Sequence, residues 1–204
     1  MGLTGLVWAG FVLVHMLGNL LIFAGPDVYN HYSYVLVSNP FLILAELLLL
    51  ITLLLHIYEG VMVTLRNRWA RPTRYAQVPS GPKAPRFQSK WMIFHGSIIL
   101  VFIITHLITF KYGATYEATV GGVQMRDLYR LVIEVFHNPA ALAWYIIALI
   151  ILGLHLSHGF YSSFASLGIY HPKFSPLLSK FGYVYAAAVA IGFIAPPVYV
   201  YFAL

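Results

Sequence analysis

Long apolar runs separated by short polar links dominate this chain of 204 residues. A helix needs about 20 predominantly apolar residues to cross a bilayer. Five segments meet this requirement, at about residues 3–24, 40–64, 92–112, 139–161 and 181–203. The pattern predicts an all-α integral membrane bundle of five transmembrane helices, which forms a single membrane domain over residues 1–204.

A shorter amphipathic pattern covers about residues 126–137. Its apolar side chains repeat at helical spacing and so lie on one face, at Leu128, Leu131, Val132, Val135 and Phe136. This pattern is typical of a helix that lies on a membrane surface. We expect it on the outer surface, where its default role is membrane anchoring and where it could also cover the end of the bundle.

The composition agrees with a membrane location and excludes several kinds of chemistry. Hydrophobic residues make up 60% of the chain and charged residues 9%, whereas a soluble domain carries about 25% charged residues. The chain has no cysteine. It therefore has no disulfides, no cysteine-ligated iron–sulfur cluster and no thiolate chemistry. We expect membrane lipid and no nucleic acid among its partners.

The net charge of +6 is unevenly distributed along the chain. The link between the second and third apolar segments has no acidic residue and seven bases: Arg66, Arg68, Arg71, Arg74, Lys83, Arg86 and Lys90. The positive-inside rule places this link in the cytoplasm, with the N-terminus inside and the C-terminus outside. The basic link is sufficient as a topology signal alone. It could in addition dock an acidic soluble partner.

The second and fourth segments share a spacing. Each opens with Asn-Pro, in "SNPFLIL" and "HNPAALAW", where Asn can cap a helix and Pro fits the first turn. In both segments a histidine follows the proline by 16 residues, from Pro40 to His56 and from Pro139 to His155. These two helices run in the same direction, so the two histidines are expected at the same depth, in the cytoplasmic half of the membrane.

The first and third segments also carry one histidine each, His15 and His106, at or past the middle of the helix. These helices run the opposite way, so both histidines are expected in the outer half. The four histidines therefore form two layers, an inner one with His56 and His155 and an outer one with His15 and His106.

Two layers of paired histidines indicate haem. Ionisable groups inside a membrane are costly and often functional, and haem needs axial ligands on both faces and an apolar slot. Zinc fits less well, because each layer has two ligands and no adjacent carboxylate. Gly60 and Gly159, four residues after the inner histidines, would leave room for a porphyrin edge or for close helix packing. The alternative is a set of structural histidines without cofactor.

Six further residues are candidates for contacts with haem propionates or quinone: Lys90, Trp91, His95, His158, Ser162 and Glu46. The first five lie near the expected cytoplasmic interface, where Trp and Lys are also ordinary membrane anchors. Glu46 lies in the outer half of its helix. It could carry quinol protons or pair with a polar neighbour.

The chain resembles the cytochrome b membrane-anchor subunit of succinate dehydrogenase or fumarate reductase, in its five-helix, di-haem form. The resemblance covers nearly the whole chain, through "LTGLVWAGFVLVHMLGNLLIFAGPDVYN", "NPFLILAELLLL", "HIYEGVMVTLRNRWARP", "DLYRLVIEVFHNP" and "LGLHLSHGFYSSFASLGIYHPK". It implies two b haems with the same axial ligands, His15 with His106 and His56 with His155.

The resemblance also implies partners and a location. A flavoprotein subunit with FAD and an iron–sulfur subunit would dock on the cytoplasmic face of a prokaryotic cytoplasmic membrane. This chain would carry electrons to or from menaquinone in a respiratory complex of the tricarboxylic acid cycle. It would hold no dicarboxylate site, and the complex could assemble into a higher oligomer.

One departure and two rival functions accompany the resemblance. Some fumarate reductases have a glutamate two residues before the ligand of the fourth helix, assigned to proton transfer, where this chain has Gly153. The rivals are a di-haem cytochrome b of another dehydrogenase, such as a hydrogenase or formate enzyme, and a haem-free membrane anchor or transporter.

Overall fold

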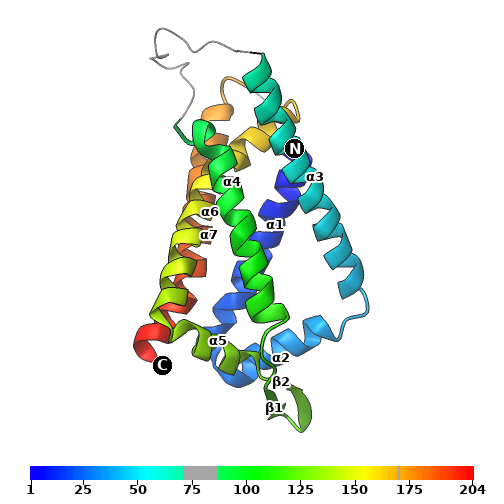
Figure 1. Ribbon diagram of the computed structural model, residues 1–204, viewed down its shortest axis with the longest axis vertical. Coiled ribbons are helices and arrows are strands. Elements are labelled where there is room, and N and C mark those ends of the chain that lie inside the picture. Colours follow the sequence, from blue (N-terminus) through cyan, green and yellow to red (C-terminus); the bar gives the residue numbers. More distant parts are fainter. Residues whose placement is uncertain (71–86, 170) are drawn as a thin grey trace.

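A computed structural model describes residues 1–70, 87–169 and 171–204, and its elements are shown in Figure 1. The α-helices are α1 (Gly2–Asn19), α2 (Pro26–Val37), α3 (Leu42–Trp69), α4 (Phe87–His106), α5 (Leu128–Phe136), α6 (Pro139–Ser166) and α7 (Ser175–Ala203). A 3-10 segment η1 (Leu20–Ala24) extends α1, and a π-helical turn η2 (Leu107–Lys111) extends α4. Strands β1 (Glu117–Val120) and β2 (Val123–Arg126) pair antiparallel.

Five helices are long and apolar enough to cross a membrane: Gly2–Ala24, Leu42–Trp69, Trp91–Lys111, Pro139–Ser166 and Ser175–Ala203. They confirm the five predicted spans, and the chain is a multi-pass membrane protein. Several helices continue past the predicted ends. α3 reaches Trp69 and α6 reaches Ser166, because polar residues continue a helix where the apolar run has already stopped.

The two Asn-Pro starts differ in structure. Asn138 caps α6 as predicted, since its side-chain oxygen accepts hydrogen bonds from the amides of Ala140 (2.9 Å) and Ala141 (3.3 Å). Asn39 instead accepts from the amide of Phe41 at 2.9 Å, and α3 begins at Leu42. The helix predicted to start at about residue 40 starts two residues later, because Asn39 forms a local turn before the helix rather than a cap.

The spanning helices pack around a core that α6 and α7 share. One buried cluster consists of Ala9 of α1, Leu156 of α6, and Ala186 and Val189 of α7. The N-terminus lies at the same end of the bundle as the end of α3 and the start of α4, and the C-terminus lies at the opposite end with α2, the hairpin and α5 (Figure 1). We call these the N-terminal end and the C-terminal end of the bundle.

Helix α3 stands apart from this core. None of its 28 residues is buried, and in Figure 1 it tilts away from the other spanning helices toward the C-terminal end. Polar contacts attach it at two places. Thr4 of α1 contacts His56, and Lys111 of η2 forms an ion pair with Glu46.

Helix α5 occupies the amphipathic segment, with Asp127 as its N-cap, because the Asp127 side chain accepts a hydrogen bond from the amide of Arg130 at 3.1 Å. The apolar face predicted for membrane anchoring is buried instead. Val132 and Phe136 belong to a core cluster with Tyr145 of α6 and Val200 of α7. The anchoring expectation was therefore wrong, because the helix packs its apolar face on the bundle.

Two elements at the C-terminal end were not predicted from the sequence. Helix α2 is tied to the start of α5 by Asn30, whose side chain donates to Asp127 (2.8 Å) and accepts from the amide of Tyr129 (2.9 Å). The hairpin turns at Gly121 and Gly122, which both have positive φ (58° and 81°), as a two-residue hairpin turn requires. Both elements are too short to register as apolar segments of spanning length.

Candidate functional site

The outer pair of histidines meets between α1 and α4. The ring centroids of His15 and His106 lie 5.8 Å apart, and the ring planes are inclined by 83°. Aromatic side chains surround the two rings: Phe11 stacks on His15 at 5.3 Å, Phe193 lies at 5.7 Å, and Phe102 and Phe110 flank His106 at 5.7 and 5.4 Å. The pair therefore lies in an apolar, aromatic shell.

A tyrosine of α6 completes the outer pair. The hydroxyl of Tyr145 lies 3.3 Å from Nδ1 of His106. The Tyr145 side chain is 6% exposed, and its ring contacts those of Phe102 and Phe136, each with centroids 4.9 Å away. The Phe136 ring of α5 thus covers the outer pair on the side that faces the C-terminal end of the bundle.

The inner pair meets between α3 and α6. The ring centroids of His56 and His155 lie 6.2 Å apart, with an interplanar angle of 66°. Nδ1 of His56 lies 3.2 Å from the hydroxyl of Thr4 on α1. Nδ1 of His155 is buried and has no hydrogen-bond partner among the residues that the structure describes.

Two glycines that the sequence argument missed lie against the inner pair. A Cβ placed on Gly5 of α1 would lie 3.6 Å from Cε1 of His56, and one on Gly96 of α4 would lie 3.8 Å from Cε1 of His155. A Cβ on Gly159 would meet nothing within 4 Å, and one on Gly60 would meet the Met1 side chain at 3.4 Å. Gly159 is therefore not a site of close helix packing in the described part of the chain, and room for a porphyrin edge stays a prediction. Close approach to the imidazoles is thus made by α1 and α4.

The spacing of both pairs fits one metal ion between two imidazoles. A metal–imidazole bond is about 2.0 Å long and the nitrogen lies about 1.1 Å from its ring centroid, so trans ligands place their centroids about 6 Å apart. The measured separations are 5.8 and 6.2 Å. Two nitrogen ligands per layer suit the axial positions of haem, and iron ligation stays a prediction.

The remaining candidates, apart from Glu46, lie on α4 and α6. His95 is 7% exposed, and it directly precedes Gly96, which approaches His155. The Ser162 hydroxyl donates to the carbonyl oxygen of His158 at 2.5 Å, so it is used within its own helix. Trp91 is 46% exposed. Lys90 belongs to α4, but its side chain lies outside the described part of the chain.

Glu46 lies in the second turn of α3 and pairs with Lys111 of η2. Both side chains are more than one-third exposed, and the ion pair links α3 to the π-helical turn after His106. The structure thus confirms that Glu46 has a polar neighbour. A role in carrying quinol protons stays a prediction.

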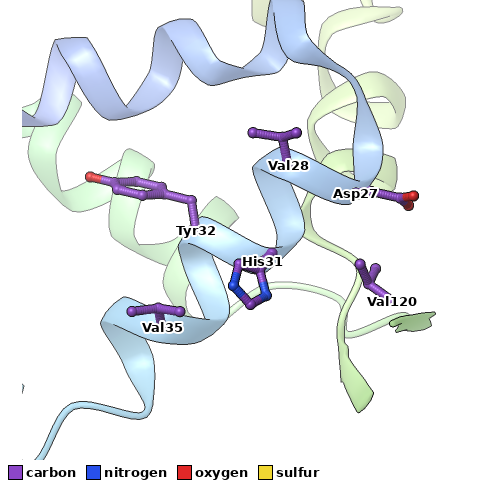
Figure 2. Close-up of a pocket in the computed structure, with 6 residues that line it drawn as sticks. All are labelled: Asp27, Val28, His31, Tyr32, Val35 and Val120. Atoms are coloured by element: carbon purple, nitrogen blue, oxygen red, sulfur yellow. The ribbon is translucent and has the colours of Figure 1, made fainter. Parts of the chain in front are cut away.

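The C-terminal end also has an open pocket that takes no part in the histidine site. Figure 2 shows it between α2 and the tip of β1, with Val28, Tyr32 and Val35 on one side and Val120 on the other. His31 and Asp27 stand at its edge. His31 lies on α2 and is exposed.

Comparisons with known proteins do not assign this chain to a family. No family model, no curated protein and no solved structure matched it.

Proposed function

We propose that this chain is the di-haem cytochrome b membrane-anchor subunit of a succinate:quinone oxidoreductase, either a succinate dehydrogenase or a fumarate reductase. The observation that carries the proposal is the two histidine pairs with ring centroids 5.8 and 6.2 Å apart. His15 and His106 would hold one haem iron, and His56 and His155 the other. Bound haem supplies reversible one-electron chemistry.

The residues of this chain provide the environment for that chemistry. The aromatic shell of the outer pair excludes water and so keeps the imidazoles neutral and available as ligands. Tyr145 and His155 lie ten residues apart on α6, so the two layers are separated by about 15 Å along that helix. The chain would thus hold two redox centres at different depths, between a soluble partner on one side and quinone in the membrane.

The direct test is the haem content of the purified chain, measured by the pyridine haemochrome assay. Two b haems per chain are expected, because each layer has two ligands. A chain without haem would contradict the proposal and leave the haem-free anchor or transporter. Two haems in a complex that succinate does not reduce would leave the di-haem cytochrome of another dehydrogenase, such as a hydrogenase or formate enzyme.

Orientation is part of the proposal. The N-terminal end of the bundle would face the cytoplasm of a prokaryote and the C-terminal end the outside, because bases concentrate in the α3–α4 link. A cysteine at Ser80 of this link, which lies outside the described residues, should resist an impermeant thiol reagent added to intact cells. A cysteine at Ser33 of α2 should react. The opposite labelling pattern would reverse the topology.

The proposed partners are an FAD-containing flavoprotein subunit and an iron–sulfur subunit. They would supply the dicarboxylate site and the clusters that a cysteine-free chain cannot hold. Menaquinone is the proposed quinone, on the strength of the resemblance, and lipid surrounds the spans. The complex could associate into a higher oligomer.

Docking of these partners should depend on the bases at the N-terminal end. Arg66 lies in the last turn of α3, while Arg71 and Arg74 lie outside the described residues. Changing all three to glutamate should release the soluble subunits during purification and leave both haems bound. Arg130→Glu, a charge reversal at the other end of the bundle, is the control. Full retention of the subunits by the triple variant would limit these charges to topology.

A further inference from the structure

In each histidine pair, one ring meets a hydroxyl group from a third helix. Nδ1 of His106 lies 3.3 Å from the Tyr145 hydroxyl, and Nδ1 of His56 lies 3.2 Å from the Thr4 hydroxyl. We infer that Tyr145 and Thr4 are positioning residues for the two haem irons, which orient the ligand rings and adjust the redox potential. This inference rests on the proposed function and deepens it.

The chemistry of a ligating imidazole supports the assignment. A neutral histidine that gives its Nε2 lone pair to iron carries its proton on Nδ1, so a hydroxyl oxygen can accept that proton in a hydrogen bond. Such outer partners fix the tautomer and the ring orientation and make the ligand more basic. A more basic ligand favours ferric over ferrous iron, so each hydroxyl should lower the potential of its own haem.

The Tyr145 hydroxyl is held in place by packing. Its ring lies among those of Phe102, Phe110 and Phe136, with centroids 4.9 to 6.0 Å away. The tyrosine therefore cannot swing away from His106 without disturbing three neighbours. A hydroxyl with so little freedom fixes the direction of the His106 ring.

The Thr4 hydroxyl is held by its own helix. It donates to the carbonyl oxygen of Met1 at 2.9 Å, which leaves its lone pairs for the Nδ1 proton of His56. The Glu59 carboxylate lies 3.5 Å from the same hydroxyl and forms an ion pair with the N-terminal amine of Met1, so the two opposite charges offset each other beside the ligand. Thr4 also connects the sparsely packed α3 to α1.

Each hydroxyl comes from a helix that carries a histidine of the other pair. Helix α1 carries His15 of the outer pair and Thr4 beside the inner pair, while α6 carries His155 of the inner pair and Tyr145 beside the outer pair. Each layer is therefore oriented by a helix that ligates the other layer. A change in one hydroxyl should nevertheless act on the nearer haem, because only that haem's ligand is contacted.

The test compares single variants of the purified, haem-loaded complex by redox titration and low-temperature EPR. Tyr145→Phe should raise the midpoint potential of the outer haem and change its EPR signal, leaving the inner haem unchanged. Thr4→Val should do the same to the inner haem alone, and Thr4→Ser should restore it. Loss of only the nearer haem would also support the inference, because the other haem then reports an intact fold.

Tyr185→Phe is the matched control, since the hydroxyl of Tyr185 donates to the carbonyl oxygen of Ala9 at 2.5 Å and contacts no histidine in the described structure. If the complex holds two haems and neither Tyr145→Phe nor Thr4→Val shifts a potential more than this control does, the inference is overturned and the proposed function stands. A wild-type chain without haem would overturn both.

Discussion

His155→Ala should remove the inner haem completely, while His158→Ala should keep both haems. His155 faces His56 with ring centroids 6.2 Å apart, so its loss removes one of the two axial ligands. His158 lies one helical turn further, about 4.5 Å toward the N-terminal end of the bundle. There it can contact a haem propionate and shift the inner haem's potential or quinone turnover without binding iron.

The other ligand variants serve as internal controls. His56→Ala should reproduce the loss of the inner haem, whereas His15→Ala and His106→Ala should each remove the outer haem. The measurement is the haem content per chain together with the EPR signals of the two low-spin centres. Loss of haem from His158→Ala, with bis-histidine signals retained in His155→Ala, would reverse the assignment of these two histidines.

Gly153→Leu should destabilise the bundle severely, because α6 and α7 meet at this position. A Cβ on Gly153 would lie 3.0 Å from Cβ of Ala190 and 3.6 Å from the carbonyl oxygen of Ala186. Extra methylene groups in a packed core cost about 1–3 kcal/mol, and here one obstacle is helix backbone. We expect a lower unfolding temperature in detergent and weaker inner haem binding, since His155 lies two residues away.

Gly10→Leu is the control for this variant, because a Cβ on Gly10 would meet nothing within 4 Å. It makes the same change in another spanning helix and should leave the unfolding temperature nearly unchanged. Equal stability of the two variants would mean that α6 and α7 are not closely packed at Gly153. The same packing leaves little room for a glutamate at position 153.

The spans could be predicted because each is a long apolar run. The positions of the four histidines along their helices also predicted which rings meet, since parallel helices of constant rise place equal offsets at equal depth. The contacts of Thr4, Tyr145, Gly5 and Gly96 could not be predicted. They depend on how each helix is rotated, and a helix that is apolar on all sides gives no periodic signal for its rotation.

Prediction from the sequence was limited in a different way for α5 and the hairpin, which lie outside the spanning helices. An amphipathic pattern identified α5, but the same pattern suits a lipid surface and a protein surface equally well. Burial of Val132 and Phe136 against α6 and α7 decided between them. The Gly-Gly pair at residues 121–122 was a local signal for the hairpin, but a prediction based on spanning length did not use it.

The sparse packing of α3 has a consequence for the biogenesis of the protein. Transmembrane helices insert individually and then associate through close packing and hydrogen bonds between helices. Helices α1, α6 and α7 have buried side chains to drive that association, whereas α3 has none. The rest of the bundle can therefore form first, with α3 joining last. His56 lies on α3. Binding of a group to this histidine would therefore coincide with closure of the bundle, and assembly would depend on that group.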